Sequence, residues 1–310
     1  MIKEIDLAKL IAEMDDKLME EGCPPSERPF VAYMRLKQRW KPHDMCTFQN
    51  DSMYIAIEYF YERLYRPSNL QVKPVHLGAF MFRDVFFPLR ISRVYGAKRT
   101  INPISLLGDI SETQKQWLLA DKQTVLTFYD QVIDLMDFSC GLEDLAGGES
   151  LSKETLEFWD LAKRQLEAAA AMVLGTFDKD PVIQNCCLSI ELLLKGALAA
   201  QGISKEMLKD QKQGYGHNLK NLANKTAEFL PNFDGETVLF VIQQLPDYVS
   251  SRYEAEQISQ LELGRFLMYA QFVSGEVLRQ FSDRNSRAHL TTGSGHDWDL
   301  TCRIFPRKTD

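Results

Sequence analysis

Long apolar runs are absent from this chain of 310 residues. Its most apolar uninterrupted run, residues 168–174, is far shorter than the roughly 18 residues that a membrane-spanning helix requires. The N-terminus, MIKEIDLAKLIAEMDDKL, is acidic and has helical spacing, and it lacks the basic segment and apolar core of a signal peptide. We therefore expect no membrane association and a cytoplasmic location.

Cysteine and histidine are also scarce. The six cysteines fit no zinc or redox spacing, and Cys186 and Cys187 are neighbours on the predicted buried side of a helix, where thiols pack as small apolar groups. No two of the five histidines have the spacing of metal ligands on one helix face. The sequence predicts neither a metal site nor a cofactor.

An excess of positive charge is missing as well. Lys and Arg number 36 against 43 Asp and Glu, for a net charge of −7, which argues against a wholly basic nucleic-acid coat protein. The hydrophobic fraction of 45% and the charged fraction of 25% are typical of globular proteins, and the length allows two domains. This net charge does not exclude local basic patches.

Helical periods dominate the chain. Residues 1–22, 52–66 and 111–138 repeat their apolar positions at helical spacing, and Ser111 with Gln114 fits a capping box. The second half shows four main helical segments, the first of them capped by Ser152. Glycine and serine cluster in residues 141–152. We predict a mainly α fold that carries a few strands, with an N-terminal domain over 1–147 and a helical bundle over 148–310.

Two segments of the first half allow more than one interpretation. In FVAYMRLKQRWK basic residues alternate with apolar ones, which predicts a strand with one basic face, for phosphate contacts or as a solubilising edge. Residues 75–99 mix phenylalanine with arginine, and Pro88 argues against one continuous helix there. That mixture suits either stacking of nucleic-acid bases or a buried aromatic cluster with arginines at its rim.

The chain is organised around residues 181–230. Apolar residues recur at helical spacing from Ile183 to Leu198, while a polar stripe carries Gln184, Glu191 and Lys195. Glu191 precedes Lys195 by four residues, the favourable order for a pair on a helix surface. After a stop at Gly202, His217 opens the next amphipathic segment.

The pattern E-L-L-L-K-x-x-L-x-x-x-G followed by H-x-L-x-x-L resembles the HEPN family of four-helix domains. The resemblance covers residues 152–281 and implies a bundle that pairs with a second copy. We therefore expect a homodimer, with the alanine run 168–171 as a surface that permits close helix packing.

In the nuclease branch of that family, an arginine and a histidine four to six residues apart begin the last helix. The resemblance implies that they cleave RNA without a metal. Arg252 stands at the arginine position here, but residues 257–259 read Gln, Ile and Ser, so the proton carrier is missing. Arg252 with Tyr253 looks more like the other branch, in which these residues bind a nucleotide or support a partner. Alternatively, Arg252 pairs with a carboxylate such as Glu191.

A second arginine and histidine with this spacing, Arg284 and His289, lies beyond the last predicted helix, in a polar segment that we expect to be a loop or a loosely docked tail. His217 stands at a position of the HEPN pattern, at the start of the third helix of the second half. Two roles are open for it, capping of the turn with packing on the neighbouring helix, or catalysis.

These observations lead to three functional hypotheses. The first is a non-nuclease HEPN-like binding or regulatory protein, linked to bacterial defence or toxin–antitoxin systems, in which a nucleotide or RNA contacts the residues Arg252, Tyr253, Glu191, Lys195 and His217. The second is a metal-independent endoribonuclease that uses Arg284 and His289. The third is a dimeric structural module whose N-terminal domain recognises a protein partner.

Overall fold

The chain forms two compact units, 1–73 and 74–310. The computed structural model describes residues 4–40, 51–70, 73–92, 102–148, 151–175, 179–210, 215–246, 258–290 and 300–307. The predicted boundary near residue 147 falls inside the second unit, because residues 74–146 share one hydrophobic core with the helices that follow them.

The first unit is a small helical bundle of α1 (Glu4–Glu20), α2 (Arg28–Trp40), α3 (Ser52–Leu64) and the single turn α4 (Pro67–Leu70). Its core is made of buried residues from the three long helices, among them Ile11, Leu18, Leu36, Ile57 and Tyr61. Between α1 and α2 the chain reverses at Gly22, whose φ of 75° is the left-handed conformation that glycine adopts without strain.

The strand predicted over residues 30–41 is wrong, since its described part belongs to α2. Residues 32, 33, 36 and 37 are buried, which is the spacing of one helix face. The ammonium of Lys37 lies on this face and donates to Tyr33 Oη at 2.7 Å and to Asp51 at 3.1 Å. The basic alternation therefore does not form one exposed face.

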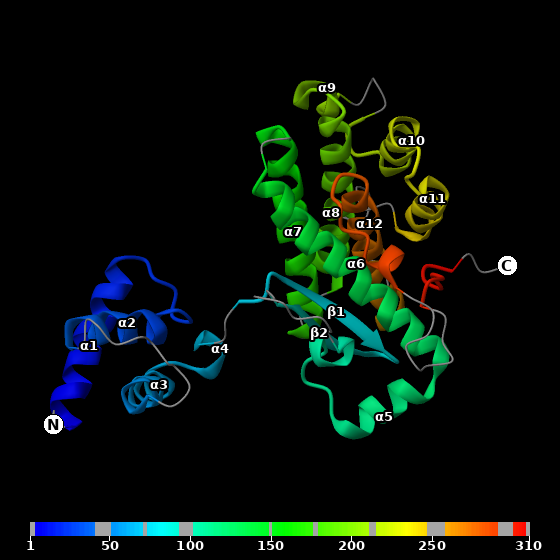
Figure 1. The fold of residues 1–310 in the computed structure, drawn as a ribbon. Helices are drawn as coiled ribbons and strands as arrows, with labels where there is room; N and C mark the ends of the chain where they lie inside the picture. Colours follow the sequence, from blue (N-terminus) through cyan, green and yellow to red (C-terminus); the bar gives the residue numbers. More distant parts are fainter. Residues whose placement is uncertain are drawn as a thin grey trace. The chain divides into compact units, whose positions relative to one another are not determined.

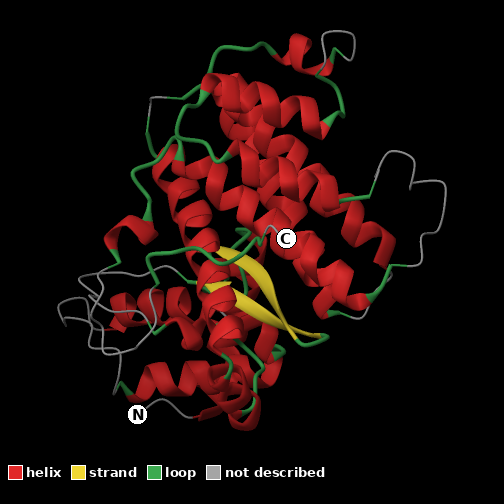
Figure 2. Ribbon diagram, turned by 90° about the vertical axis from the view of Figure 1, so that its right-hand side faces the viewer, coloured by secondary structure: helices red, strands yellow, loops and turns green. Residues whose placement is uncertain are grey.

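An antiparallel hairpin opens the second unit. Strands β1 (His76–Phe82) and β2 (Val85–Ile91) pair in the register His76 to Ile91, and they are the only strands among the described residues (yellow in Figure 2). Phe80, Phe82 and Phe87 are buried, whereas Arg83 is exposed at the turn. For these residues the structure agrees with the second of the two interpretations of this segment, a buried aromatic cluster with arginine at its rim.

A helix side chain covers the outer edge of β1. Gln271 accepts a hydrogen bond from the backbone N–H of Ala79 at 2.9 Å and donates to its carbonyl at 3.0 Å. The carboxamide thus satisfies the two backbone groups that a third strand would otherwise pair. A two-stranded sheet can be buried among helices for this reason.

The helices of the second unit pack around α8 (Lys179–Ala200), which contacts α7 (Lys153–Leu174), α10 (Leu219–Phe229) and α12 (Gln260–Arg279) (Figure 1). The remaining elements are η1 (Pro103–Leu106), α5 (Glu112–Ala120), α6 (Lys122–Ala146), α9 (Lys205–Lys209), α11 (Gly235–Gln244) and η2 (Ser286–His289). The capping box at Ser111 and the cap at Ser152 are confirmed, and so is a mainly α fold with a few strands.

The core position of α8 explains its apolar composition. Residues 181–200 are long and apolar enough to cross a membrane by length and composition alone, but 72% of their most apolar window is buried inside the protein. Polar residues interrupt this segment, so it contains no long uninterrupted apolar run. Burial on all sides by neighbouring helices accounts for such a helix in a globular domain.

The described part of the C-terminal segment is docked on α6, whereas residues 291–299 of the segment expected to be a loop or a loosely docked tail lie outside the described residues. Asp130 of α6 accepts hydrogen bonds from the backbone N–H groups of Ile304 and Phe305 at 2.9 and 2.8 Å, and it pairs with Arg287. Arg303 donates twice to Asp134, at 2.5 and 2.8 Å. Buried carboxylates therefore hold the described part of the tail on α6.

Candidate functional site

Three of the predicted binding residues meet in space. Glu191 and Lys195 lie one turn apart on α8, and Lys195 Nζ donates to Glu191 Oε1 at 2.7 Å. His217, which lies just before α10, places its Nδ1 3.1 Å from Oε1 and 3.0 Å from Oε2 of the same carboxylate. One carboxylate thus contacts a lysine of its own helix and a histidine from another segment.

The pair on α8 forms as its spacing predicts, and it is buried instead of lying on an exposed helix surface. Glu191 is 2% exposed and Lys195 is 6% exposed. Ionised side chains are almost never buried to this degree without partners, because the loss of hydration is expensive. Here the opposite charges and the short hydrogen bond offset that cost.

His217 lies at the edge of this buried pair, with 48% of its side chain exposed. The residue before it, Gly216, has a φ of 64°, a left-handed conformation that favours glycine. The residue after it, Asn218, caps α10 by accepting a hydrogen bond from the N–H of Asn221 at 3.0 Å. The capping role is therefore taken by Asn218, and His217 instead joins the start of α10 to α8.

The contact with Glu191 determines how the imidazole can be used. A proton on Nδ1 is donated to the carboxylate, and in the neutral ring this leaves Nε2 as a hydrogen-bond acceptor. A protonated ring instead presents an N–H donor at Nε2 and a positive charge. The carboxylate thus fixes the ring orientation, while Lys195 balances the negative charge of Glu191.

The surroundings of His217 favour a negatively charged ligand. The positive end of the α10 dipole begins at residue 218. Lys225 lies over the ring of Tyr215, two residues before His217, with its Nζ 4.9 Å from the ring centroid. The start of α10 therefore adds positive potential beside the imidazole, while Lys225 is placed only against the neighbouring Tyr215.

Arg252 and Tyr253 lie outside the described residues. Their predicted contact with a ligand, and the alternative pairing of Arg252 with Glu191, therefore stay predictions. In the described part of the chain, the Glu191 carboxylate already contacts Lys195 and His217.

The structure does not join Arg284 and His289. The guanidinium of Arg284 donates to Asp144 of α6 at 2.5 and 3.2 Å. His289 lies exposed in η2, and no hydrogen bond links the two described side chains. An arginine that is held by a carboxylate is poorly placed to stabilise charge on a phosphate.

A row of buried carboxylates on α6 escaped the sequence analysis. Asp134 and Asp137 both accept from Arg279 of α12, at 3.0 and 3.1 Å, and Asp130 lies one turn earlier. Burial raises the pKa of Asp137, and the hydrogen bond from Ser286 and the charge of Arg279 oppose this shift. The i, i+4, i+7 spacing of three aspartates in an otherwise apolar stretch was the available signal.

This acidic row serves the fold. Each of its carboxylates is occupied by arginine or by backbone N–H groups of the C-terminal segment. Over the described ranges, no three His, Cys, Asp or Glu side chains are grouped as metal ligands would be. The group of Glu191, Lys195 and His217 is therefore the better candidate for a ligand site.

Comparison of the chain with protein-family models, with curated proteins and with solved structures finds no match.

Proposed function

We propose that this protein is a HEPN-like binding or regulatory protein that takes a phosphate-bearing ligand of the nucleotide class beside His217 and does not cleave RNA. The observation that carries the proposal is the buried carboxylate of Glu191, which holds a buried lysine and a half-exposed histidine from separate segments.

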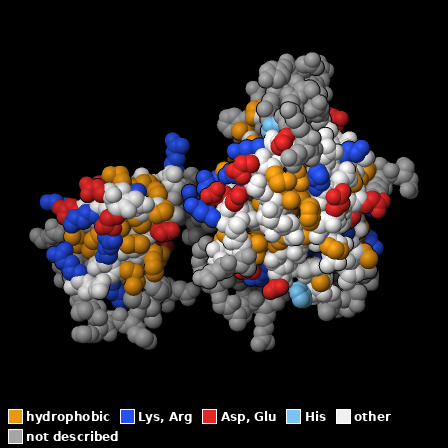
Figure 3. Space-filling view, turned by 90° about the horizontal axis from the view of Figure 1, so that it is seen from above, with side chains coloured by type: hydrophobic (Ala, Val, Ile, Leu, Met, Phe, Trp, Pro, Cys, Tyr) orange, Lys and Arg blue, Asp and Glu red, His pale blue; other side chains and the backbone are white. Residues whose placement is uncertain are grey.

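The chemistry of the site supports binding of an anion. A protonated imidazole donates from Nε2, and the start of α10 contributes positive potential beside it. Arg252 and Tyr253 would add a bidentate phosphate contact and a ring for base stacking. Acidic and basic side chains are interspersed on the face of the second unit in Figure 3, so the attraction is local.

The family resemblance supports the same residues. Glu191 and Lys195 belong to the motif E-L-L-L-K, and His217 begins the motif H-x-L-x-x-L. The absence of histidine from residues 257–259 favours binding over cleavage. The cytoplasmic location and the setting in bacterial defence or toxin–antitoxin systems belong to this proposal.

A thermal-shift titration with ATP, ADP and AMP tests it. A ligand that binds only the folded state at one hundred times its dissociation constant stabilises that state by about 2.7 kcal/mol. We expect one of these nucleotides to raise Tm, His217→Ala to abolish the rise, and His289→Ala to leave it unchanged. A rise that is absent in the wild type, or lost equally in both variants, contradicts the proposal.

RNA cleavage is the competing outcome. Labelled structured and single-stranded RNA are incubated with the protein in EDTA, beside the double variant Arg284→Ala, His289→Ala. Cutting that disappears in this variant would establish an endoribonuclease and overturn the binding proposal. No cutting together with no nucleotide effect would favour the structural module.

The homodimer is part of the same proposal and needs its own measurement. Ala169 and Ala170, which belong to the alanine run expected to face a second copy, are fully buried inside the chain. Ala168 is half-buried and Ala171 is exposed, so the four alanines do not form one continuous face for a second copy. Sedimentation velocity gives the oligomeric state, and a monomer at all concentrations would exclude pairing.

A further inference from the structure

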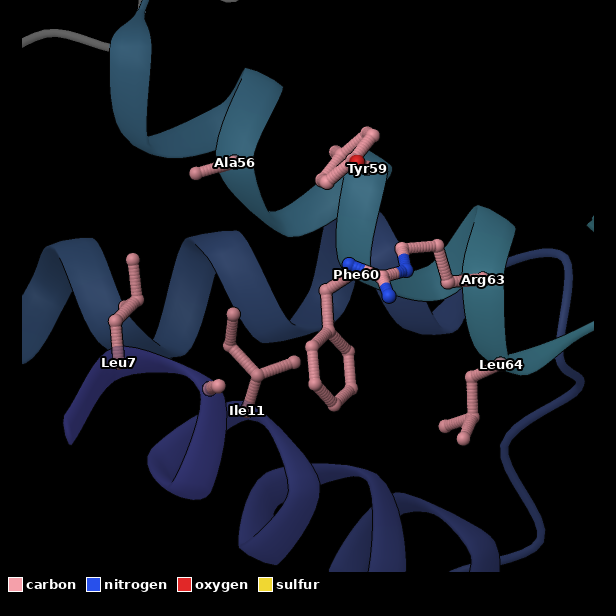
Figure 4. Close-up of a pocket in the computed structure, with 8 residues that line it drawn as sticks. Leu7, Ile11, Ala56, Tyr59, Phe60, Arg63 and Leu64 are labelled. Atoms are coloured by element: carbon pink, nitrogen blue, oxygen red, sulfur yellow. The ribbon is translucent and has the colours of Figure 1, made fainter. Parts of the chain in front are cut away.

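A half-open groove lies between α1 and α3 of the first unit (Figure 4). Its volume is about 480 Å³, which falls within the range of small-molecule sites. Phe60 extends from α3 toward α1, beside Ile11. The apolar walls are made of Leu7, Ala8, Ile11, Ala56, Phe60 and Leu64.

The polar groups of the groove come from two residues of α3. The guanidinium carbon of Arg63 lies 5.6 Å from the ring centroid of Tyr59, a distance that allows a cation–π contact. Among the described residues, no acidic side chain lines the groove and Arg63 forms no ion pair with a carboxylate. The groove therefore presents one positive charge beside an apolar channel.

The apolar character of α3 extends beyond what the first unit buries. Its sequence, SMYIAIEYFYERL, is hydrophobic on nearly every side, yet Ile55, Tyr59 and Leu64 are 55%, 61% and 54% exposed. A helix of this composition is normally covered on all faces. Hydrophobic side chains are also visible on the face of the first unit in Figure 3.

We propose that this groove binds an amphiphile with a linear apolar chain and a carboxylate, the chemical class of a fatty acid. The chain lies against the apolar walls, and the carboxylate pairs with Arg63, whose planar fork of donors matches its two oxygens. Both parts of the ligand are thus complemented by the groove.

Two other occupants fit less well. A second copy docked through the same groove about a two-fold axis would bring two Arg63 side chains together, with no lining carboxylate to separate them. A partner helix, about 10–12 Å across with its side chains, would rest on the groove and insert only side chains. The isolated cation and the small volume favour the amphiphile.

Isothermal titration of the full chain with octanoate, decanoate and dodecanoate, each below its micelle concentration, tests the proposal. We expect saturable binding of one molecule per chain, strengthened about fourfold for each added methylene. Arg63→Gln should weaken dodecanoate binding by about tenfold or more, because a charge-assisted hydrogen bond is lost. Arg66→Gln, an exposed arginine two residues beyond α3, is the matched control and should change the affinity less than twofold.

Two further comparisons separate the groove from nonspecific uptake. Ala56→Trp fills the groove and should abolish binding, and Arg63→Gln carries the test if this variant does not fold. Dodecyltrimethylammonium has the same chain with the opposite charge and should bind at least tenfold more weakly.

The proposal is overturned by any of four results. These are no saturable binding of the fatty acids, equal binding of the cationic amphiphile, equal losses in the two arginine variants, or full binding by folded Ala56→Trp. An oligomer that folded Ala56→Trp converts to monomers would also overturn it, by assigning the groove to a second copy.

Discussion

Replacing Lys195 by methionine removes the ammonium that balances a buried carboxylate. The side chains of Lys195 and Glu191 are 8% and 3% exposed, and Nζ of Lys195 lies 2.7 Å from Oε1 of Glu191. Little solvent therefore screens the pair. Methionine retains an unbranched apolar chain in the same space. The change therefore tests the charge with little effect on packing.

The expected cost follows from the desolvation of the remaining partner. Removing one member of a buried pair typically costs about 3–5 kcal/mol, whereas replacing both members by apolar residues is often neutral or stabilising. His217 still contacts Glu191, so we expect Lys195→Met to cost about 3 kcal/mol. The double variant Glu191→Leu, Lys195→Met should lie within about 1 kcal/mol of the wild type.

Urea unfolding of the wild type, both single variants and the double variant measures these values. Tryptophan fluorescence and circular dichroism must give coincident transitions for a two-state analysis of the second unit. A coupling energy near zero between Glu191 and Lys195, or a cost below about 1 kcal/mol for Lys195→Met, would show that the two charges do not depend on each other. A buried carboxylate that has lost its hydration would be destabilised more than that by the loss of its ammonium partner. The double variant should fold and yet show no nucleotide-dependent rise in Tm.

Three further predictions concern the rest of the second unit. Gly275→Ala should lower the free energy of unfolding by about 1–3 kcal/mol in urea, because the new Cβ would lie 2.8 Å from backbone atoms of Asp134. This loss is expected although alanine is the better helix former. The control is Gly147→Ala, whose new Cβ would lie 3.6 Å from its nearest neighbour, the carbonyl oxygen of Asp144. Burial lowers the pKa of His76, so the unfolded state binds a proton at a pH where the folded state does not. The free energy of unfolding should therefore fall as the pH drops from about 6.5 to 5, by at most about 1.4 kcal/mol per pH unit. His76→Gln should flatten this pH dependence. Arg303→Met should loosen the C-terminal segment, seen as faster hydrogen exchange at the amides of Ile304 and Phe305, and unchanged exchange there would show that the ion pair does not hold it.

The sequence was informative where a local pattern and a buried face coincide. On α8, residues such as Ile190 and Leu194 recur at helical spacing and are fully buried. The caps at Ser111 and Ser152 depend on residues within three positions, so their side chains alone predict them. These features need no knowledge of distant parts of the chain.

The errors have a common physical cause, which is that burial depends on tertiary contacts that the local residue pattern does not reveal. On α2, a short alternation matched a strand, and the helix became evident only through the burial of Lys37 against Tyr33 and Asp51. The aspartates of α6 look solvent-exposed by residue type. Their partners Arg279 and Arg303 follow them by more than 140 residues, so no local signal reveals the pairing.

Part of the candidate site could be predicted for a similar reason. Glu191 and Lys195 stand one turn apart on one helix, and the motif that includes His217 pointed to the third member. Their burial could not be read from the i, i+4 spacing, because the same spacing serves exposed pairs. The packing of α8 between α7, α10 and α12 brings Glu191 out of water.

The burial of this carboxylate is also the physical argument for function. Most of the other buried side chains of α8 are apolar, so an apolar pair at 191 and 195 would also suit the core. What Glu191 provides, and leucine cannot, is an acceptor about 3 Å from Nδ1 of His217 that fixes the imidazole at the start of α10. The apolar double variant therefore separates the fold from the site: if our reasoning is right, it keeps the stability of the bundle and loses the ligand.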